Sequence, residues 1–139
     1  MHFVKPNQDY NILILDDEPI VCKRLKAELE RSGYRVEAFT NSMQALGRIE
    51  EKGFDVIITD LKMKEIDGEQ VLRIVKDKYP TTQVIIITGY ATSECAKQCL
   101  SNGAFDFISK PFKLDDIQLV VNRAIYFREG VFGGTPLTY

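Results

Sequence analysis

Apolar runs recur along the chain, and they predict the strands of a parallel β-sheet. Ile12–Leu15, Val56–Thr59 and Val84–Ile87 are nearly continuous in apolar residues. That composition is typical of central parallel strands, because helices cover both faces of such a sheet. Val36–Phe39 and Phe105–Ile108 have a more mixed composition, which places these two predicted strands nearer the sheet edges.

Between the strands, apolar residues recur at the spacing of amphipathic helices. The predicted helical stripes are Val21, Leu25 and Leu29; Ala45, Leu46 and Ile49; Val71, Leu72 and Val75; Ala96, Cys99 and Leu100; and Ile117, Val120, Val121 and Ala124. Gly33, Gly53 and Gly103 follow helices, where a left-handed C-terminal cap favours glycine. Because β-α-β crossovers are right-handed, the alternation predicts an α/β fold: a doubly wound, five-stranded parallel sheet with helices on both faces.

Polar residues of complementary chemistry stand at the ends of four predicted strands. Asp16 and Asp17 follow the first strand, Asp60 the third, Thr88 the fourth and Lys110 the fifth. Ligands of an open α/β sheet bind at the carboxyl ends of its strands, so we expect these side chains to meet there. Three carboxylates that repel each other favour a hard divalent cation with oxygen ligands. The hydroxyl and the ammonium can then bind the oxygens of a phosphoryl group.

Length and charge narrow the possible functions. A chain of 139 residues favours a single domain. The formal net charge is −2, from 18 basic and 20 acidic residues, so we expect no direct nucleic-acid binding by this chain. No stretch approaches the roughly 20 apolar residues of a membrane span, and the N-terminus lacks a hydrophobic signal core. We therefore expect a cytoplasmic protein without a membrane contact.

Three cysteines, Cys22, Cys95 and Cys99, are odd in number and lack the spacing of a disulfide framework, which fits a reducing compartment. Two of these thiols could share a metal, but no other cysteine or nearby histidine completes the ligand set. We therefore interpret the cysteines as small, partly buried helix residues. We expect residues 1–9 to be a flexible N-terminus, and 130–139 to be the start of a linker or an added tail.

Four motifs in this order resemble the receiver domain of two-component response regulators. They are LDDEP, ITDLKMKEIDG, IIITGYA and GAFDFISKPF, and the resemblance runs from about Tyr10 to Arg128. It implies a single CheY-like receiver over residues 10–129, with the flavodoxin-like strand order 2-1-3-4-5. The last motif is more similar to receivers of the NtrC type than to those of the OmpR type.

The resemblance also implies a role for each residue of the site. Asp60 would accept a phosphoryl group from a histidine kinase, and Lys110 would bridge to the phosphoryl oxygens. Asp17 and Asp60 would bind Mg²⁺ directly, Asp16 through water, and Lys62 through its backbone carbonyl. Such a domain is a signalling module rather than an enzyme, because it catalyses only its own phosphorylation and dephosphorylation.

A switch is implied as well, through Thr88 and an aromatic residue of the fifth strand, here Phe107. In the family, the threonine moves toward the phosphoryl oxygens and the aromatic ring turns inward. The face formed by the fourth helix, fifth strand and fifth helix would then bind an output domain or partner, or form a phosphorylation-dependent homodimer. The family also has a cis peptide bond at the position of Lys110–Pro111.

Other functions of this architecture remain open at the level of sequence. A magnesium-dependent phosphohydrolase of the haloacid-dehalogenase type would have DxDxT on its first strand, where this chain has DDEPI. A flavodoxin-type electron carrier needs a Ser/Thr/Gly-rich phosphate loop there, and acidic residues repel phosphate. A degenerate receiver that only docks partners would not need the complete set of site residues.

Overall fold

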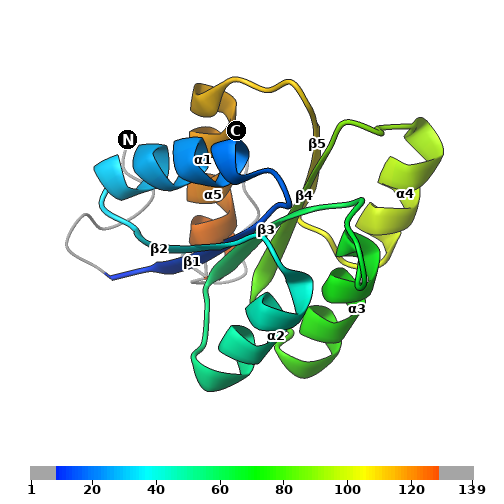
Figure 1. Cartoon of the computed structure of the whole chain (residues 1–139), viewed down its shortest axis with the longest axis horizontal. Helices are drawn as coiled ribbons and strands as arrows, with labels where there is room; N and C mark the ends of the chain where they lie inside the picture. The colour runs from blue at the N-terminus through cyan, green and yellow to red at the C-terminus, as the bar shows by residue number, and fades with distance from the viewer. Residues whose placement is uncertain (1–8, 129–139) are drawn as a thin grey trace.

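Strands and helices alternate through the part of the chain that the structure describes, residues 9–128 of a computed structural model (Figure 1). The elements are β1 (Asn11–Leu15), α1 (Pro19–Arg31), β2 (Arg35–Phe39), α2 (Ser42–Glu51), β3 (Val56–Asp60), α3 (Gly68–Lys78), β4 (Gln83–Thr88), α4 (Ser93–Ser101), β5 (Asp106–Ser109) and α5 (Leu114–Arg128). The predictions for residues 1–8 and for 130–139 lie outside the described residues.

All five strands are parallel and form one sheet in the order β2-β1-β3-β4-β5. The predicted strand order is therefore confirmed. The chain direction across the sheet reverses between β1 and β3, since β2 lies on one side of β1 and the later strands lie on the other. In doubly wound folds this reversal leaves a crevice at the carboxyl ends of the strands, and ligands bind in it.

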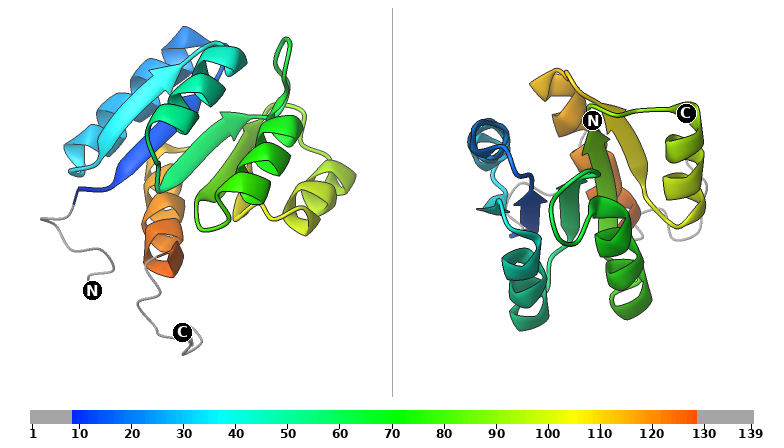
Figure 2. Two further views of the ribbon diagram at one scale, coloured as in Figure 1. Left: turned by 90° about the horizontal axis from the view of Figure 1, so that it is seen from below. Right: turned by 45° about the vertical axis from the view of Figure 1, so that its right-hand side comes forward.

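Helices cover both faces of the sheet, as the strand composition predicts (Figures 1 and 2). Ile12 and Ile14 face the core beneath α1 and α5, whereas Leu13 and Leu15 face the core beneath α2, α3 and α4. All four side chains are fully buried. Because successive side chains of a strand point to opposite faces, one apolar run contributes to both cores. The two packed cores fix the strand ends, and with them the geometry of the crevice.

Some local predictions differ from the structure. The fifth strand begins at Asp106, one residue later than predicted. Phe105 still donates its backbone N–H to the carbonyl of Val84 in β4 at 2.7 Å, and its ring packs edge-on against Phe127 with centroids 5.5 Å apart. Gly103 has the expected left-handed φ of +104°, as does Gly33, but Gly53 is not among the residues with positive φ. Helix α2 instead ends in extended backbone at Lys52, so no left-handed residue is needed there.

Charged side chains hold α2 against β2, the strand at one edge of the sheet. Glu37 of β2 accepts hydrogen bonds from Nε of Arg48 at 2.7 Å and from Nζ of Lys52 at 3.0 Å. These contacts lower the pKa of Glu37 from its ordinary 4.5 to about 2, with Arg48 the largest contributor. Charged residues of this kind also protect an edge strand from pairing with another chain.

The Glu37 contacts predict a pH-dependent contribution to stability. A depressed carboxyl pKa stabilises the fold above the ordinary pKa, and this contribution is lost as the pH falls toward the folded-state pKa of about 2. Glu37→Gln should therefore lower the free energy of unfolding by about 1 kcal/mol at neutral pH, the upper range for partly exposed ion pairs. Urea denaturation at neutral pH and at about pH 3 should show this difference shrinking in acid.

Glu50→Gln serves as the control, because Glu50 meets Lys78 at 3.4 Å and both side chains are more than half exposed. This variant should unfold close to the wild type at both pH values. A Glu37→Gln penalty that stays constant down to about pH 3 would contradict the electrostatic explanation.

Candidate functional site

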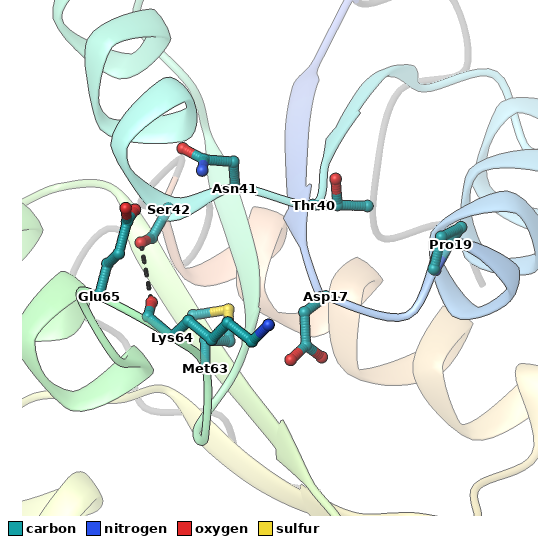
Figure 3. Close-up of a pocket in the computed structure, with 8 residues that line it drawn as sticks. All are labelled: Asp17, Pro19, Thr40, Asn41, Ser42, Met63, Lys64 and Glu65. Atoms are coloured by element: carbon teal, nitrogen blue, oxygen red, sulfur yellow. Dashed lines mark hydrogen bonds between the residues drawn. The ribbon is translucent and has the colours of Figure 1, made fainter.

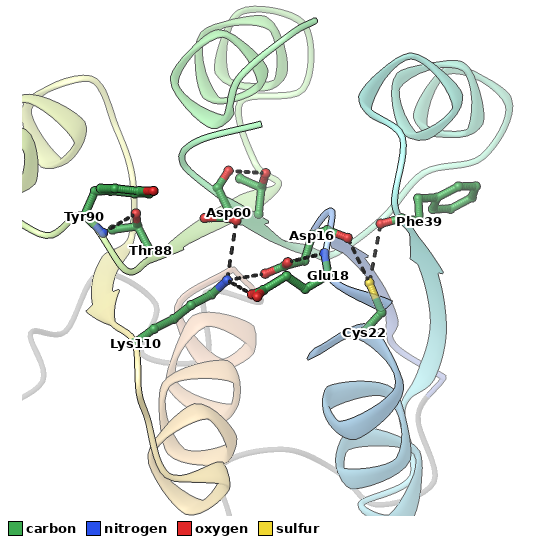
Figure 4. Close-up of polar contacts among 9 residues, drawn as sticks. Asp16, Glu18, Cys22, Phe39, Asp60, Thr88, Tyr90 and Lys110 are labelled. Carbon is green, nitrogen blue, oxygen red and sulfur yellow. Dashed lines mark hydrogen bonds and ion pairs between the residues drawn. The ribbon is translucent and has the colours of Figure 1, made fainter. Parts of the chain in front are cut away.

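The carboxyl ends of four strands bring the expected polar residues to one edge of the sheet, and Figure 4 shows Asp16, Asp60, Thr88 and Lys110 there. Asp60 is the last residue of β3 and Thr88 the last of β4, while Asp16 and Asp17 directly follow β1. Lys110 directly follows β5, and its backbone N–H donates to the carbonyl of Thr88 at 2.8 Å. The backbone pairing of β5 with β4 thus continues one residue past the end of β5. It fixes the position of the Lys110 backbone from which the side chain extends.

The ammonium group of Lys110 lies among three carboxylates (Figure 4). Its Nζ is 2.9 Å from Oδ2 of Asp16, 2.9 Å from Oε1 of Glu18 and 3.4 Å from Oδ2 of Asp60. Asp16 is fully buried and Asp60 nearly so. Buried carboxylates are costly unless a cation neutralises them, so Lys110 is the group that makes this cluster tolerable in the apolar sheet.

Burial and neighbouring negative charges raise the pKa values of the two buried acids, Asp16 and Asp60. Loss of solvation is the main cause for both, and the neighbouring Asp16 charge raises the pKa of Asp60 further. Burial lowers the pKa of Lys110, but the contacts with Asp16 and Glu18 outweigh it and the net pKa lies above the usual lysine value. The site therefore holds the positive charge of Lys110 beside several carboxylates. A second cation would further stabilise the ionised form of these carboxylates.

Three of the carboxylates fit a metal ion. Asp16, Asp17 and Asp60 each offer an oxygen, and these oxygens lie within 4.8 Å of one another. Oδ2 of Asp16 is buried, and it accepts no well-aligned hydrogen bond within residues 9–128 despite its ion-pair contact with Lys110. Oxygen atoms gathered in this way suit a hard divalent cation. The predicted acidic cluster is thus present and has the chemistry of a metal site.

The loop between β3 and α3 is held close to the end of β3. The backbone N–H of Gly68 donates to the carbonyl of Leu61 at 2.8 Å, and a Cβ on Gly68 would lie 2.1 Å from the carbonyl oxygen of Asp60. Only glycine allows this approach. Lys62, the expected carbonyl ligand, lies in this loop and lines the same pocket as Asp60.

Ser42, the first residue of α2, anchors the other side of that loop. Its buried hydroxyl accepts from the N–H of Ile66 at 3.3 Å. The same hydroxyl donates to the carbonyl of Lys64 at 3.5 Å (Figure 3). The loop also contains Glu65 in a left-handed conformation, with φ of 64°. A non-glycine residue in that region is uncommon, and the Ser42 contacts help to hold it.

An open pocket of about 590 Å³ lies over the strand ends. Its lining residues are Asp17, Glu18, Asp60, Lys62, Gly89, Tyr90 and Lys110. Thr88 is buried beneath it, and its hydroxyl oxygen accepts a hydrogen bond from the N–H of Tyr90 at 3.0 Å (Figure 4). That contact leaves the hydroxyl proton of Thr88 available for an acceptor.

A second pocket, of about 370 Å³, lies on the other side of Asp17 (Figure 3). Its lining residues are Asp17, Pro19, Thr40, Asn41, Ser42, Met63, Lys64 and Glu65. Asp17 lines both pockets, so the expected metal ligand is reachable from two sides.

Two further expectations concern β5 and its exit. Phe107 is partly buried and packs against the core beneath α2, α3 and α4. The Lys110–Pro111 peptide bond is cis, as the resemblance implies. The inward turning of Phe107 stays a prediction.

The contact between Glu18 and Lys110 has no clear signal in the sequence, where Glu18 reads as a surface or supporting residue. The two residues are separated by 92 positions, and only the sheet order brings them together. The roles of Ser42 and Gly68 are equally hidden, although the sequence contains an N-cap residue, Asp67, directly before Gly68. A glycine directly before a helical stripe was the available signal for Gly68.

All three cysteines lie on helices, as predicted: Cys22 on α1, and Cys95 and Cys99 on α4. All three cysteines are free, and the Cys22 thiol donates to the carbonyl of Asp16 at 3.3 Å. Burial raises the pKa of Cys22 to about 11, as it does for Cys99, which makes both thiols poor nucleophiles. Within residues 9–128, every helix is too short or too polar to cross a lipid bilayer.

Known proteins are similar to this chain in both sequence and fold. The family described as the response regulator receiver domain matches residues 12–122. The transcriptional regulatory protein ZraR of Klebsiella oxytoca is 36% identical over 85% of this chain and 27% of its own length. A putative NtrX-like response regulator of Rickettsia typhi is 40% identical over 82% of this chain and 24% of its own length. The chain thus spans about a quarter of these relatives.

A solved structure extends the comparison to an activated state. The beryllofluoride-activated receiver domain of NtrC4, which is a dimer, matches with a TM-score of 0.81 and 30% identity. The match covers 85% of this chain and 98% of that one. Together with the ZraR and NtrX-like relatives, it confirms the expected similarity to regulators of the NtrC type. The chain belongs to the response regulator receiver domains, the phosphoryl-accepting signalling modules of two-component systems.

Proposed function

We propose that Asp60 is the residue that accepts the phosphoryl group. The observation that carries the proposal is the position of its carboxylate, at the end of β3 in an open pocket, 3.4 Å from the Lys110 ammonium. Aspartate carboxylates form covalent phosphoryl intermediates when they are positioned and electrostatically supported. Asp16 is fully buried, which makes it less accessible than Asp60.

The transfer step needs positioning and charge neutralisation rather than a strong base. A carboxylate oxygen of Asp60 forms a bond to phosphorus while the bond from phosphorus to the donor atom breaks. The donor, a kinase histidine nitrogen or the acetate oxygen of acetyl phosphate, leaves with that electron pair. Negative charge spreads over the transferred oxygens, and Lys110 and the hydroxyl of Thr88 would bind them. Water later cleaves the acyl phosphate and restores the carboxylate.

Asp17, Asp60 and the backbone carbonyl of Lys62 would hold a magnesium ion directly, and Asp16 would do so through water. When bound, the ion would neutralise the acidic cluster and the oxygens of the incoming phosphoryl group. The gathered carboxylates and the buried Oδ2 of Asp16 support this assignment. Asp16 also orients Lys110, through the contact at 2.9 Å.

The output of the domain would be a change of surface between two arrangements. The hydroxyl of Thr88 would move from the N–H of Tyr90 toward a phosphoryl oxygen, and Phe107 would turn further into the core. Exposed apolar side chains on α4 and α5, Leu100 and Leu119, support a docking role for the face formed by α4, β5 and α5. Such coupling requires an element with two arrangements that phosphorylation biases.

The partners of this proposal are a cytoplasmic histidine kinase as donor and an output domain or protein as acceptor of the signal. The NtrC4 receiver is a dimer when activated by beryllofluoride, which supports a phosphorylation-dependent homodimer here as well. The chain has 18 basic and 20 acidic residues and therefore no basic excess. This composition argues against direct nucleic-acid binding by this chain. A docking-only receiver is the alternative, and the complete site argues against it.

Replacing the acceptor should abolish phosphorylation. Asp60→Asn should take up no phosphate from acetyl phosphate and magnesium, because an amide is a poor nucleophile toward phosphorus. Intact-mass spectrometry would follow the uptake. Asp77→Asn, on the exposed surface of α3, should be phosphorylated like the wild type. Undiminished uptake by Asp60→Asn would refute the assignment of Asp60.

Replacing Asp17, a proposed metal ligand, should slow phosphorylation without destabilising the fold. Asp17→Ala should lose at least about tenfold in phosphorylation rate at the magnesium optimum of the wild type, a loss of about 1.4 kcal/mol of transition-state stabilisation. Its melting temperature should be unchanged or higher, because one of several repelling carboxylates is gone. Glu65→Gln, in the second pocket beside Asp17, is the control and should keep the wild-type rate. A wild-type rate in Asp17→Ala would contradict the metal role.

The threonine should be needed for the switch but not for occupancy of the site. Thr88→Ala should still bind beryllofluoride with magnesium, yet lose most of the chemical-shift changes on α4, β5 and α5. Thr88→Ser, which keeps the hydroxyl, should retain them. The comparison is made by recording amide spectra of each variant with and without beryllofluoride. A full response of Thr88→Ala on that face would exclude this coupling route.

A further inference from the structure

Glu18 occupies the N-cap of α1, but its side chain does not cap the helix. Its backbone carbonyl accepts from the N–H groups of Val21 and Cys22, at 3.0 and 3.3 Å. The side chain makes no capping hydrogen bond, whereas the residues preferred at this position use a short side-chain oxygen for that purpose. Helix formation therefore does not explain why a glutamate is present here.

The Glu18 carboxylate instead reaches across the crevice to Lys110. Oε1 of Glu18 and Nζ of Lys110 are 2.9 Å apart, closer than Nζ is to Asp60 (Figure 4). Lysine has three N–H donors, and three carboxylates surround this one. The two shorter contacts, to Asp16 and Glu18, hold the ammonium on the β1–α1 side of the crevice.

The three contacts differ in how easily they can be given up. The Asp16 side chain is 0% exposed and that of Asp60 is 9% exposed, while the Glu18 side chain is 58% exposed. An exposed ion pair is weak and is screened by salt, whereas a buried one is not easily replaced by water. Glu18 is thus the contact that Lys110 can release when another anion arrives at Asp60.

We propose that Glu18 is a positioning residue that competes with the phosphoryl group for Lys110. It holds the ammonium toward α1 before phosphorylation and draws it away from the phosphoryl oxygens afterwards, so it weakens occupancy of the site and shortens the lifetime of the acyl phosphate. The inference rests on the proposed role of Lys110 at the phosphoryl group. It adds a residue that sets how long the phosphorylated state lasts.

Glu18→Gln tests the competition, because the amide keeps the size of the side chain and removes its charge. Beryllofluoride affinity with magnesium and the half-life of phosphorylated protein should both rise about twofold to fivefold, the range expected for one partly exposed ion pair. The gain should shrink at high salt. The chemical shift of Lys110 Nζ should change in the free protein, which a merely structural role of Glu18 would not require.

Glu65→Gln is the matched control, since Glu65 lies near Asp17 in the neighbouring pocket and belongs to a different loop. It removes one negative charge near the site and should leave affinity and half-life within about twofold of the wild type. Equal gains in both variants would show a general charge effect and overturn the role of Glu18. Unchanged or weakened beryllofluoride binding in Glu18→Gln would overturn it as well.

A second variant, Glu18→Asp, tests the inference even if Glu18→Gln fails to fold. Glu18→Asp keeps the charge and supplies a good N-cap residue, but its shorter side chain should hold Lys110 less well and give a smaller gain than Glu18→Gln. If Glu18→Gln is unfolded and Glu18→Asp gains neither beryllofluoride affinity nor half-life, the inference is also overturned. Failure of the wild type itself to bind beryllofluoride or accept phosphate would instead refute the proposed function, so the two failures are distinguishable.

Discussion

The balance of charge around Lys110 is the constraint on which the rest of the site depends. Asp16 and Asp60 are buried at strand ends, and that burial is the main cause that raises the pKa values of both carboxyl groups. Lys110 follows β5, three strand spacings or about 14 Å from β1, yet its ammonium lies 2.9 Å from Asp16. This cation reaches Asp16 and Asp60 only through a combination of three features: the strand order, the β5–α5 loop and the full length of the lysine side chain.

The fold could be predicted from the sequence because its signals are local and repeated. Runs such as Val84–Ile87 are apolar on both sides, and the helical stripes between them face the sheet. Chain order alone then places Asp16, Asp60 and Lys110 at the same edge, since parallel strands end together. The precise boundaries were less predictable: Phe105 looks like a strand residue, but its ring is used for packing against Phe127 at a helix.

Contacts that depend on side-chain reach across the sheet could not be predicted. Glu18 looks like a surface residue after the acidic pair, and its partner is 92 positions away. Ser42 looks like a helix-start residue, but its hydroxyl bonds to the β3–α3 loop. Glu18 and Ser42 lie next to the acidic cluster of Asp16, Asp17 and Asp60 but are not part of it. We infer that receivers with the same acceptor set can differ in phosphoryl lifetime through neighbours of this kind.

The central claim is that the carboxylate of Asp60 carries the phosphoryl group. Borohydride reduction tests it directly, because it converts an acyl phosphate into an alcohol and so marks an aspartate as homoserine. Wild-type protein would be phosphorylated with acetyl phosphate and magnesium, reduced, digested and sequenced by mass spectrometry. The account predicts homoserine at position 60 and an unmodified Asp16 and Asp17. Homoserine at position 16 or 17, with position 60 unmodified, would contradict it.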